Sequence, residues 1–224
     1  MPAKKRYCYD YPRPMVTVDC VLLRVAERSL QVLLVERRSP PCRGNWALPG
    51  GFIKMKEPLE VAVIRELREE TAVKDISCLI QLGAYGDPGR DPRGRVISVA
   101  FVGILPAGGA APRAGSDAAA AQWQPVEALP RGLAFDHATI LGDAVRRLAA
   151  GGRTSGVLFA FLRDPFTPEA LSDVLFAVYG LELSPADYLK PFLEMQIVRR
   201  LKGGRTYRVA GWHSARHSAP RRQK

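Results

Sequence analysis

The chain has 224 residues, of which 47% are hydrophobic, enough for one large domain or two small ones. No run of about 18 apolar residues occurs, so we expect no membrane span. The basic N-terminus lacks an apolar segment, so we expect no signal peptide. Cys8, Cys20, Cys42 and Cys78 have no Cys-x-x-Cys spacing. They predict neither a zinc site nor a disulfide framework, and a reducing cytoplasm is the default.

The first half of the chain alternates strand and helix patterns. Residues 16–25 and 30–35 are β-branched and Leu-rich and predict a strand pair, and residues 39–45 have loop composition. Strands are also predicted over residues 76–85 and 96–105, the second apolar enough to be central. The Ala/Gly/Pro-rich residues 106–121 predict a mobile connection before a short strand at 122–126. Asp136 is a candidate N-cap for a helix to about residue 149.

Residues 57–72 predict a helix in which Pro58 suits the first helical position. At 3.6 residues per turn, one face of this helix carries apolar side chains in its N-terminal part and carboxylates in its C-terminal part. Apolar residues on other sides, including Val61, indicate a helix buried between layers. The face with the carboxylates consists of Leu59, Ala62, Val63, Glu66 and Glu70.

Glu66, Glu69 and Glu70 form an acidic group at the end of this helix, with Arg65 beside it. Clustered carboxylates repel, and burying them unpaired is costly, whereas a hard divalent cation relieves both effects. The alternative is a solvated helix end in which Arg65 and Arg68 form ion pairs. The fixed spacing from glycines upstream favours the cation site.

A long motif carries a family resemblance. Gly51 is followed by five residues, Glu57, seven residues and then Arg-Glu-Leu-Arg-Glu-Glu at 65–70. This pattern resembles the Nudix box of hydrolases that cleave nucleoside diphosphates linked to another group. Residues 48–52, Leu-Pro-Gly-Gly-Phe, match the usual lead-in, and Ala72 departs from the usual Gly.

The resemblance implies an α+β fold over residues 1–150, a Nudix α/β/α sandwich with a mixed sheet. It implies that Mg²⁺, with Mn²⁺ as a substitute, is held by Glu66, Glu69, Glu70 and the Gly51 carbonyl. Arg65 would assist catalysis, and Glu57 would support the carboxylates indirectly. Gly50 and Gly51 would also contact the substrate.

The loop at 85–95, the following Val-Ile-Ser-Val, and Phe135-Asp136-His137 resemble a Nudix subgroup that handles ADP-ribose. That subgroup includes ADP-ribose pyrophosphatases and Nudix-related transcriptional regulators of NAD metabolism. Arg90, Arg93 and Arg95 offer forked donors for phosphate, unless they pair with Asp87 and Asp91 instead. For His137, a satisfied helix-start histidine is favoured over a catalytic base.

Residues 151–156 have linker composition. After apolar residues 157–162, Thr167 predicts an N-cap, Gly180 a helix end, and Ser184 the start of a further helix to about Met195. A hairpin with a glycine turn is predicted at 197–209. This order is typical of a winged helix, and residues 151–224 resemble the C-terminal DNA-binding domain of those regulators.

The net charge is +11, and from residue 197 onward no Asp or Glu occurs. A basic terminal segment is typical of a surface for nucleic acid, although the last dozen residues could equally be a solubilising tail. The predicted recognition helix has only Lys190 beside Asp187, which favours contact with the phosphate backbone over sequence reading. The residues expected to contact double-stranded DNA are Arg199, Arg200, Lys202, Arg205 and Arg208.

Three hypotheses follow. The first is a Mg²⁺-dependent Nudix hydrolase that cleaves ADP-ribose, or a related nucleoside diphosphate derivative, into AMP and ribose 5-phosphate. The second is an ADP-ribose-sensing, DNA-binding regulator that acts as a homodimer, with or without residual hydrolysis. In the third, residues 151–224 serve only as a dimerisation or lid element.

Overall fold

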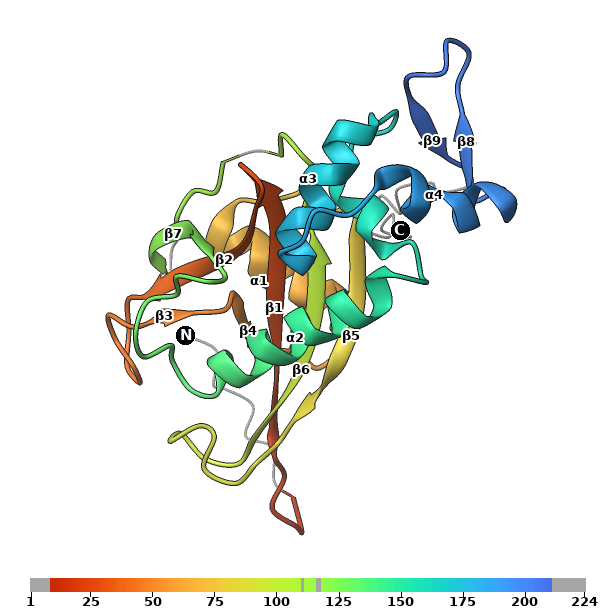
Figure 1. Ribbon diagram of the computed structural model, residues 1–224. Coiled ribbons are helices and arrows are strands. Elements are labelled where there is room, and N and C mark those ends of the chain that lie inside the picture. The colour runs from red at the N-terminus through yellow and green to blue at the C-terminus, as the bar shows by residue number, and fades with distance from the viewer. Residues whose placement is uncertain (1–8, 110, 116–117, 211–224) are drawn as a thin grey trace, which may run out of the picture.

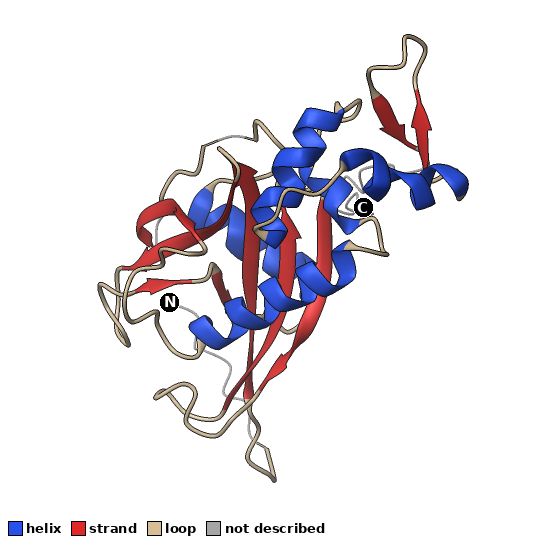
Figure 2. Cartoon of the chain, viewed as in Figure 1, coloured by secondary structure: helices blue, strands red, loops and turns tan. Residues whose placement is uncertain are grey.

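The computed structural model describes residues 9–109, 111–115 and 118–210. It shows an α+β fold in which helices cover both faces of a mixed sheet (Figure 1, Figure 2). The elements are β1 (Met15–Ala26), β2 (Ser29–Arg37), β3 (Trp46–Ala47), β4 (Gly50–Phe52), α1 (Leu59–Thr71), β5 (Cys78–Tyr85), β6 (Val96–Ile104), β7 (Ala118–Pro125), α2 (His137–Gly152), the 3-10 helix η1 (Val157–Phe161), α3 (Pro168–Tyr179), α4 (Pro185–Glu194), β8 (Val198–Arg200) and β9 (Tyr207–Val209).

The main sheet has seven strands, with β3, β2, β1, β6 and β5 in spatial order. β1 runs parallel to β6, and the other pairs are antiparallel, so the predicted mixed sheet is confirmed. β6 lies between β1 and β5 and is largely buried, as its apolar sequence predicts.

Alternation along β1 separates two hydrophobic layers. Val18, Cys20 and Leu22 face α1, whereas Val21 and Leu23 face the side covered by α2. Figure 1 shows α1 behind the sheet and α2 with α3 in front of it. The predicted α/β/α sandwich is therefore confirmed for the Nudix-like part of the chain.

One edge of β1 is shared by two partners. Residues Leu23 to Ala26 pair with β2, whereas Thr17 to Asp19 pair with β4. The end of β2 therefore diverges from β1, and a space opens between β2 and β4. This divergence is what places a pocket beside the N-terminal half of β1.

Three local expectations were wrong. Val61 is 38% exposed, because α1 packs on one face of the sheet and is not enclosed between layers. The connection after β6 is not free: the backbone N–H groups of Arg113 and Gly115 bond the carbonyls of Thr71 and Glu70, and β7 begins already at Ala118. These bonds satisfy carbonyls at the end of α1 that have no partner within the helix.

The core continues without a break into the C-terminal helices. Phe159, Phe161, Leu171 and Phe192 are buried in the same cluster as the front face of the sheet. Residues 151–156, predicted as a linker, are the end of α2 and the turn after it. Ser77 Oγ donates to the Ala160 carbonyl at 2.6 Å, which ties η1 to the start of β5.

The C-terminal elements follow the predicted order. Thr167 caps α3 by accepting from the Ala170 N–H at 3.3 Å, Gly180 ends it in the left-handed conformation, and Ser184 caps α4. β8 and β9 form the predicted hairpin. The basic residues from 211 onward lie outside the described residues. Within the described ranges, no helix has the length and apolar character needed to cross a membrane.

Candidate active site

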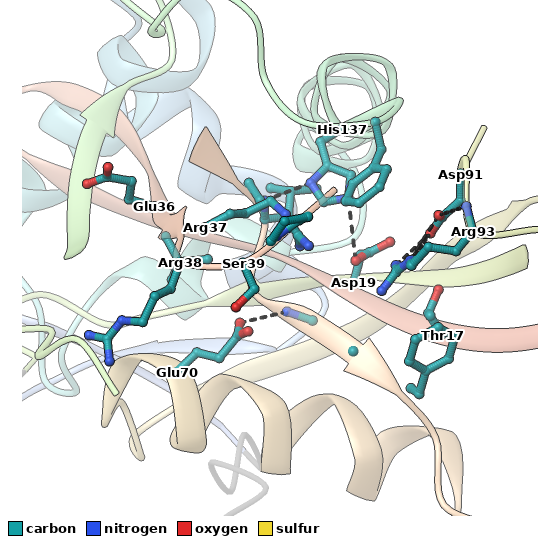
Figure 3. Close-up of a pocket in the computed structure, with 18 of the residues that line it drawn as sticks. Thr17, Asp19, Glu36, Arg37, Arg38, Ser39, Glu70, Asp91, Arg93 and His137 are labelled. Carbon is teal, nitrogen blue, oxygen red and sulfur yellow. Dashed lines mark hydrogen bonds and ion pairs between the residues drawn. The ribbon is translucent and has the colours of Figure 1, made fainter. Parts of the chain in front are cut away.

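A pocket of about 330 Å³ lies where β2 and β4 diverge, between the start of α2 and the loop after β5 (Figure 3). Its volume falls in the range of small-molecule sites. Its polar lining comes from five segments of the chain and includes Thr17, Asp19, Arg37, Arg38, Ser39, Glu70, Arg90, Asp91, Arg93 and His137.

Glu70 is the buried carboxylate at the α1 side of this pocket. Its Oε2 accepts a hydrogen bond from the Gly50 N–H at 3.0 Å. Burial raises the pKa of Glu70 to about 8, and the charges of Glu66 and Asp19 act in the same direction. Burial also raises the pKa of Glu66. Both carboxylates are therefore held where their charge is poorly solvated.

Arg65 holds three carboxylates together, those of Glu66 and Glu69 on α1 and that of Glu57 just before it. Its Nε and Nη2 donate to the two oxygens of Glu57 at 2.7 and 2.8 Å. Its Nη1 donates to Glu66 at 2.6 Å and to Glu69 at 3.1 Å. These bonds raise the pKa of Arg65 and lower the pKa of Glu57. One guanidinium thus fixes three carboxylates.

Two glycines allow the backbone to reach these carboxylates. A Cβ at Gly51 would lie 2.6 Å from the Glu66 carboxyl group, and one at Gly50 would lie 2.2 Å from the Val18 carbonyl oxygen. Real Cβ atoms essentially never approach that closely. Gly50 is therefore required by the approach of β4 to the backbone of β1, whereas a side chain at Gly51 would displace the Glu66 carboxyl group that Arg65 holds.

The donor set fits a hard divalent cation. It is made of carboxylate oxygens whose charge burial disfavours, the chemistry that Mg²⁺ and Mn²⁺ accept. Among the described residues, no three His, Cys, Asp or Glu side chains already converge as a ready metal cluster. Arg65 forms ion pairs with two of these carboxylates, Glu66 and Glu69.

Asp19 is the centre of a buried network at the pocket floor. It accepts a hydrogen bond from Ser98 Oγ, and its Oδ1 lies 3.6 Å from His137 Nε2. His137 Nδ1 accepts from the Leu48 N–H at 2.9 Å, so the neutral ring has its proton on Nε2. Burial lowers the pKa of His137. His137 is therefore a satisfied histidine at the helix start, the interpretation favoured from the sequence.

The three arginines of the loop after β5 have different environments. Arg90 is 4% exposed and bonds Asp136 through Nε and Nη2, with Asp19 at 3.6 Å. Asp136 is the N-cap residue of α2, as expected, but its side chain binds Arg90 and makes no capping hydrogen bond. Arg93 bonds Asp91 and lines the pocket, whereas Arg95 donates to the Gly86 carbonyl and is not among the lining residues.

Several pocket residues were missed by sequence reasoning. Asp19 sits inside an apolar strand, and its polarity in a buried run was a usable signal. Arg37 and Arg38 lie between the second predicted strand and the loop at 39–45, and no motif singles them out. Arg38 Nη2 donates to the Ala118 carbonyl at 2.8 Å. Phe135 adopts a φ of 55°, a strained conformation that no sequence pattern indicates.

The predicted nucleic-acid residues gather on the β8–β9 hairpin. Arg199, Arg200, Lys202, Arg205 and Arg208 are all exposed. Arg200 Nε donates to the Gly204 carbonyl at 3.0 Å, and Arg208 Nε lies 3.1 Å from Asp164 Oδ2. In α4, Tyr188 is turned inward and donates to the Gly152 carbonyl. The hairpin is thus the basic surface of the described C-terminal segment.

The sandwich, the glycine pair and the acidic end of α1 are features of a Nudix domain. Residues 13–147 match the family model described as NUDIX domain, and the chain belongs to the Nudix family. Nudix hydrolases generally use divalent metal ions.

The known proteins that resemble the chain include an ADP-ribose pyrophosphatase and two transcriptional regulators. The chain is 42% identical over 137 residues to the ADP-ribose pyrophosphatase of Methanocaldococcus jannaschii, covering 61% of this chain and 76% of that protein. It is 30% identical over 192 residues to the ADPR responsive transcriptional repressor NtrR of Acinetobacter baylyi, covering 84% of this chain and 76% of that one. Shewanella oneidensis NrtR, solved in complex with a 27mer DNA, superposes with a TM-score of 0.72 at 29% identity, covering 87% of this chain and 93% of that one.

Proposed function

We propose that the chain is a divalent-metal-dependent hydrolase that cleaves the diphosphate of ADP-ribose or of a related nucleoside diphosphate derivative. The main support is that the carboxylates of α1 meet an arginine-lined pocket at Gly50 and Gly51. Hydrolysis of a diphosphate needs positive charge near its oxygens, which the arginines supply. It also needs a site that activates water, which the carboxylates would provide by holding a metal ion. The resemblance to an ADP-ribose pyrophosphatase supports the choice of substrate.

Glu66, Glu69 and Glu70, with the Gly51 carbonyl, would hold Mg²⁺ or Mn²⁺. When bound, the ion supplies charge neutralisation on the diphosphate and lowers the pKa of water. Arg65 and Glu57 orient the carboxylates, and the Gly50 N–H fixes Glu70.

The pocket side of the site would hold the substrate. Arg93 and the main chain of Gly50 and Gly51 line it and are proposed ligand contacts. Arg90 acts indirectly, since its guanidinium is engaged with Asp136 and Asp19. One water added across the phosphoanhydride of ADP-ribose gives AMP and ribose 5-phosphate.

The test is release of AMP from ADP-ribose with Mg²⁺ or Mn²⁺. We expect Glu69→Gln combined with Glu70→Gln to lower kcat by about 100-fold or more, equivalent to roughly 3 kcal/mol, and to weaken Mg²⁺ uptake in calorimetry. Glu60→Gln, on the exposed side of the same helix, is the matched control. Equal Mg²⁺ uptake by altered and native protein, or no turnover of any nucleoside diphosphate derivative by folded protein, would refute the proposal.

A second candidate function is a regulator that binds DNA and responds to ADP-ribose. The observation that favours it is α2, which reaches from the pocket to the C-terminal helices. Its first residue, His137, lies at the pocket floor, and the carbonyls of Ala149 and Gly152 accept from the hydroxyls of Tyr179 and Tyr188. A ligand that shifts the start of α2 would therefore act on α3 and α4.

A gel shift against the duplex upstream of the chain's own gene tests this function, with and without ADP-ribose. Release by ADP-ribose supports the sensor. Arg199→Gln with Lys202→Gln removes two exposed charges, and the slope of log affinity against log salt should fall by about 2. We expect a homodimer, with twice the chain mass of 24.6 kDa in sedimentation. A dimer that binds no duplex would instead favour a dimerisation or lid role for the C-terminal segment.

A further inference from the structure

The guanidinium groups around the pocket differ in whether their charge is compensated. Arg65 is bonded to Glu57, Glu66 and Glu69. Arg90 is bonded to Asp136, and Arg93 to Asp91. These cations are neutralised by the fold itself, so each offers an incoming anion little uncompensated charge.

Arg37 is different. It lies at the end of β2 and lines the pocket, and within the described part of the chain it has no carboxylate partner. Its Nε donates to the Pro41 carbonyl at 2.8 Å, and its backbone N–H donates to the Asn45 carbonyl at 3.0 Å. For its two terminal nitrogens, no hydrogen bond occurs among the described residues.

The orientation of Arg37 is fixed. Its guanidinium carbon lies 4.9 Å from the centre of the Phe135 ring, so one face is stacked while Nε is held by Pro41. Figure 3 shows the side chain extending into the pocket near His137 and Asp19, on the side opposite Glu70.

We propose that the two terminal nitrogens of Arg37 bind a phosphate oxyanion of the nucleotide that enters the pocket beside Glu70. A guanidinium anchored at Nε and stacked on one face presents its remaining edge as a preformed fork, the geometry that suits phosphate. This proposal rests on the proposed function, because it takes a nucleoside diphosphate derivative as the ligand. To the contact proposed for Arg93 it adds an anion contact from a residue outside the loop of Arg90, Arg93 and Arg95.

Calorimetry with AMP and Mg²⁺ tests this assignment without turnover. For Arg37→Gln we expect AMP affinity to fall by about 10- to 100-fold, the range for a lost hydrogen bond to a charged group. Binding of adenosine, which has no phosphate, should change by less than about twofold. The AMP affinity of Arg37→Lys, which keeps the charge but loses the forked guanidinium, should lie between the affinities of Arg37→Gln and the wild type.

The matched control is Arg43→Gln, which removes the same charge from the exposed part of the adjacent loop. AMP binding by Arg37→Gln that equals the wild type, or no AMP binding by the wild type, would overturn the proposal. So would an equal loss of AMP and adenosine binding. AMP binding that depends on Arg37, in a protein that does not hydrolyse ADP-ribose, would support Arg37 while refuting the hydrolase.

Discussion

Replacing Arg65 by Gln should destabilise the protein strongly, because this side chain compensates three carboxylates at once. Glu57 and Glu66 are 10% and 13% exposed in their side chains, so neither regains full hydration when its partner is lost. Breaking a buried ion pair by removing one partner costs about 3–5 kcal/mol. The residual exposure of both groups places the expected loss near the lower end, about 3 kcal/mol.

For a chain of this length, about 3 kcal/mol corresponds to a fall in Tm of roughly 6–12 °C. Differential scanning calorimetry measures it directly. The Tm of Arg65→Lys should lie between those of Arg65→Gln and the wild type, since lysine keeps the charge but lacks the forked guanidinium that spans Glu57 and Glu66. Mg²⁺ should restore more Tm to Arg65→Gln than to the wild type, because a cation relieves the carboxylates that Arg65 no longer holds. A Tm change below about 1 °C would show that the carboxylates do not need this partner.

Three further variants test other parts of the structure. Ala72→Gly should raise stability by about 0.5–1 kcal/mol in urea unfolding, because Ala72 ends α1 with a φ of 59° that glycine adopts without strain. His137→Gln should remove one contribution to acid destabilisation. The pKa of His137 is lowered in the folded wild type, so below about pH 6.5 the unfolded chain binds a proton that the folded chain excludes. The free energy of unfolding of the wild type therefore decreases as the pH is lowered, and that of the variant should decrease less. An unchanged pH slope in the variant would contradict this. Phe161→Ala should cost about 3–5 kcal/mol and lower a single calorimetric transition, whereas two transitions with only one affected would show that the C-terminal helices fold separately.

Much of the fold could be predicted because the signals were local. The β-branched runs of β1 and β2, the capped starts of α3 and α4, and the glycine that ends α3 each depend on residues a few positions apart. Such patterns act through backbone conformation and side-chain periodicity, which a short window of sequence contains. Val61 and the loop at 113–115 were mispredicted because exposure and capping there depend on distant segments.

The family, the helix with its carboxylates and the hairpin with its charges can be recognised from the sequence alone, since in each case the residues lie close together along the chain. Which of the pocket charges remain available depends on the folded arrangement. Arg37, Arg90 and Arg93 look alike in the sequence, but Arg90 meets Asp136 from 46 positions away and Arg93 meets Asp91 beside it. Arg37 meets a carbonyl and a ring instead. A buried charge is compensated by a partner that usually lies on another element, so the pair forms only when the chain folds.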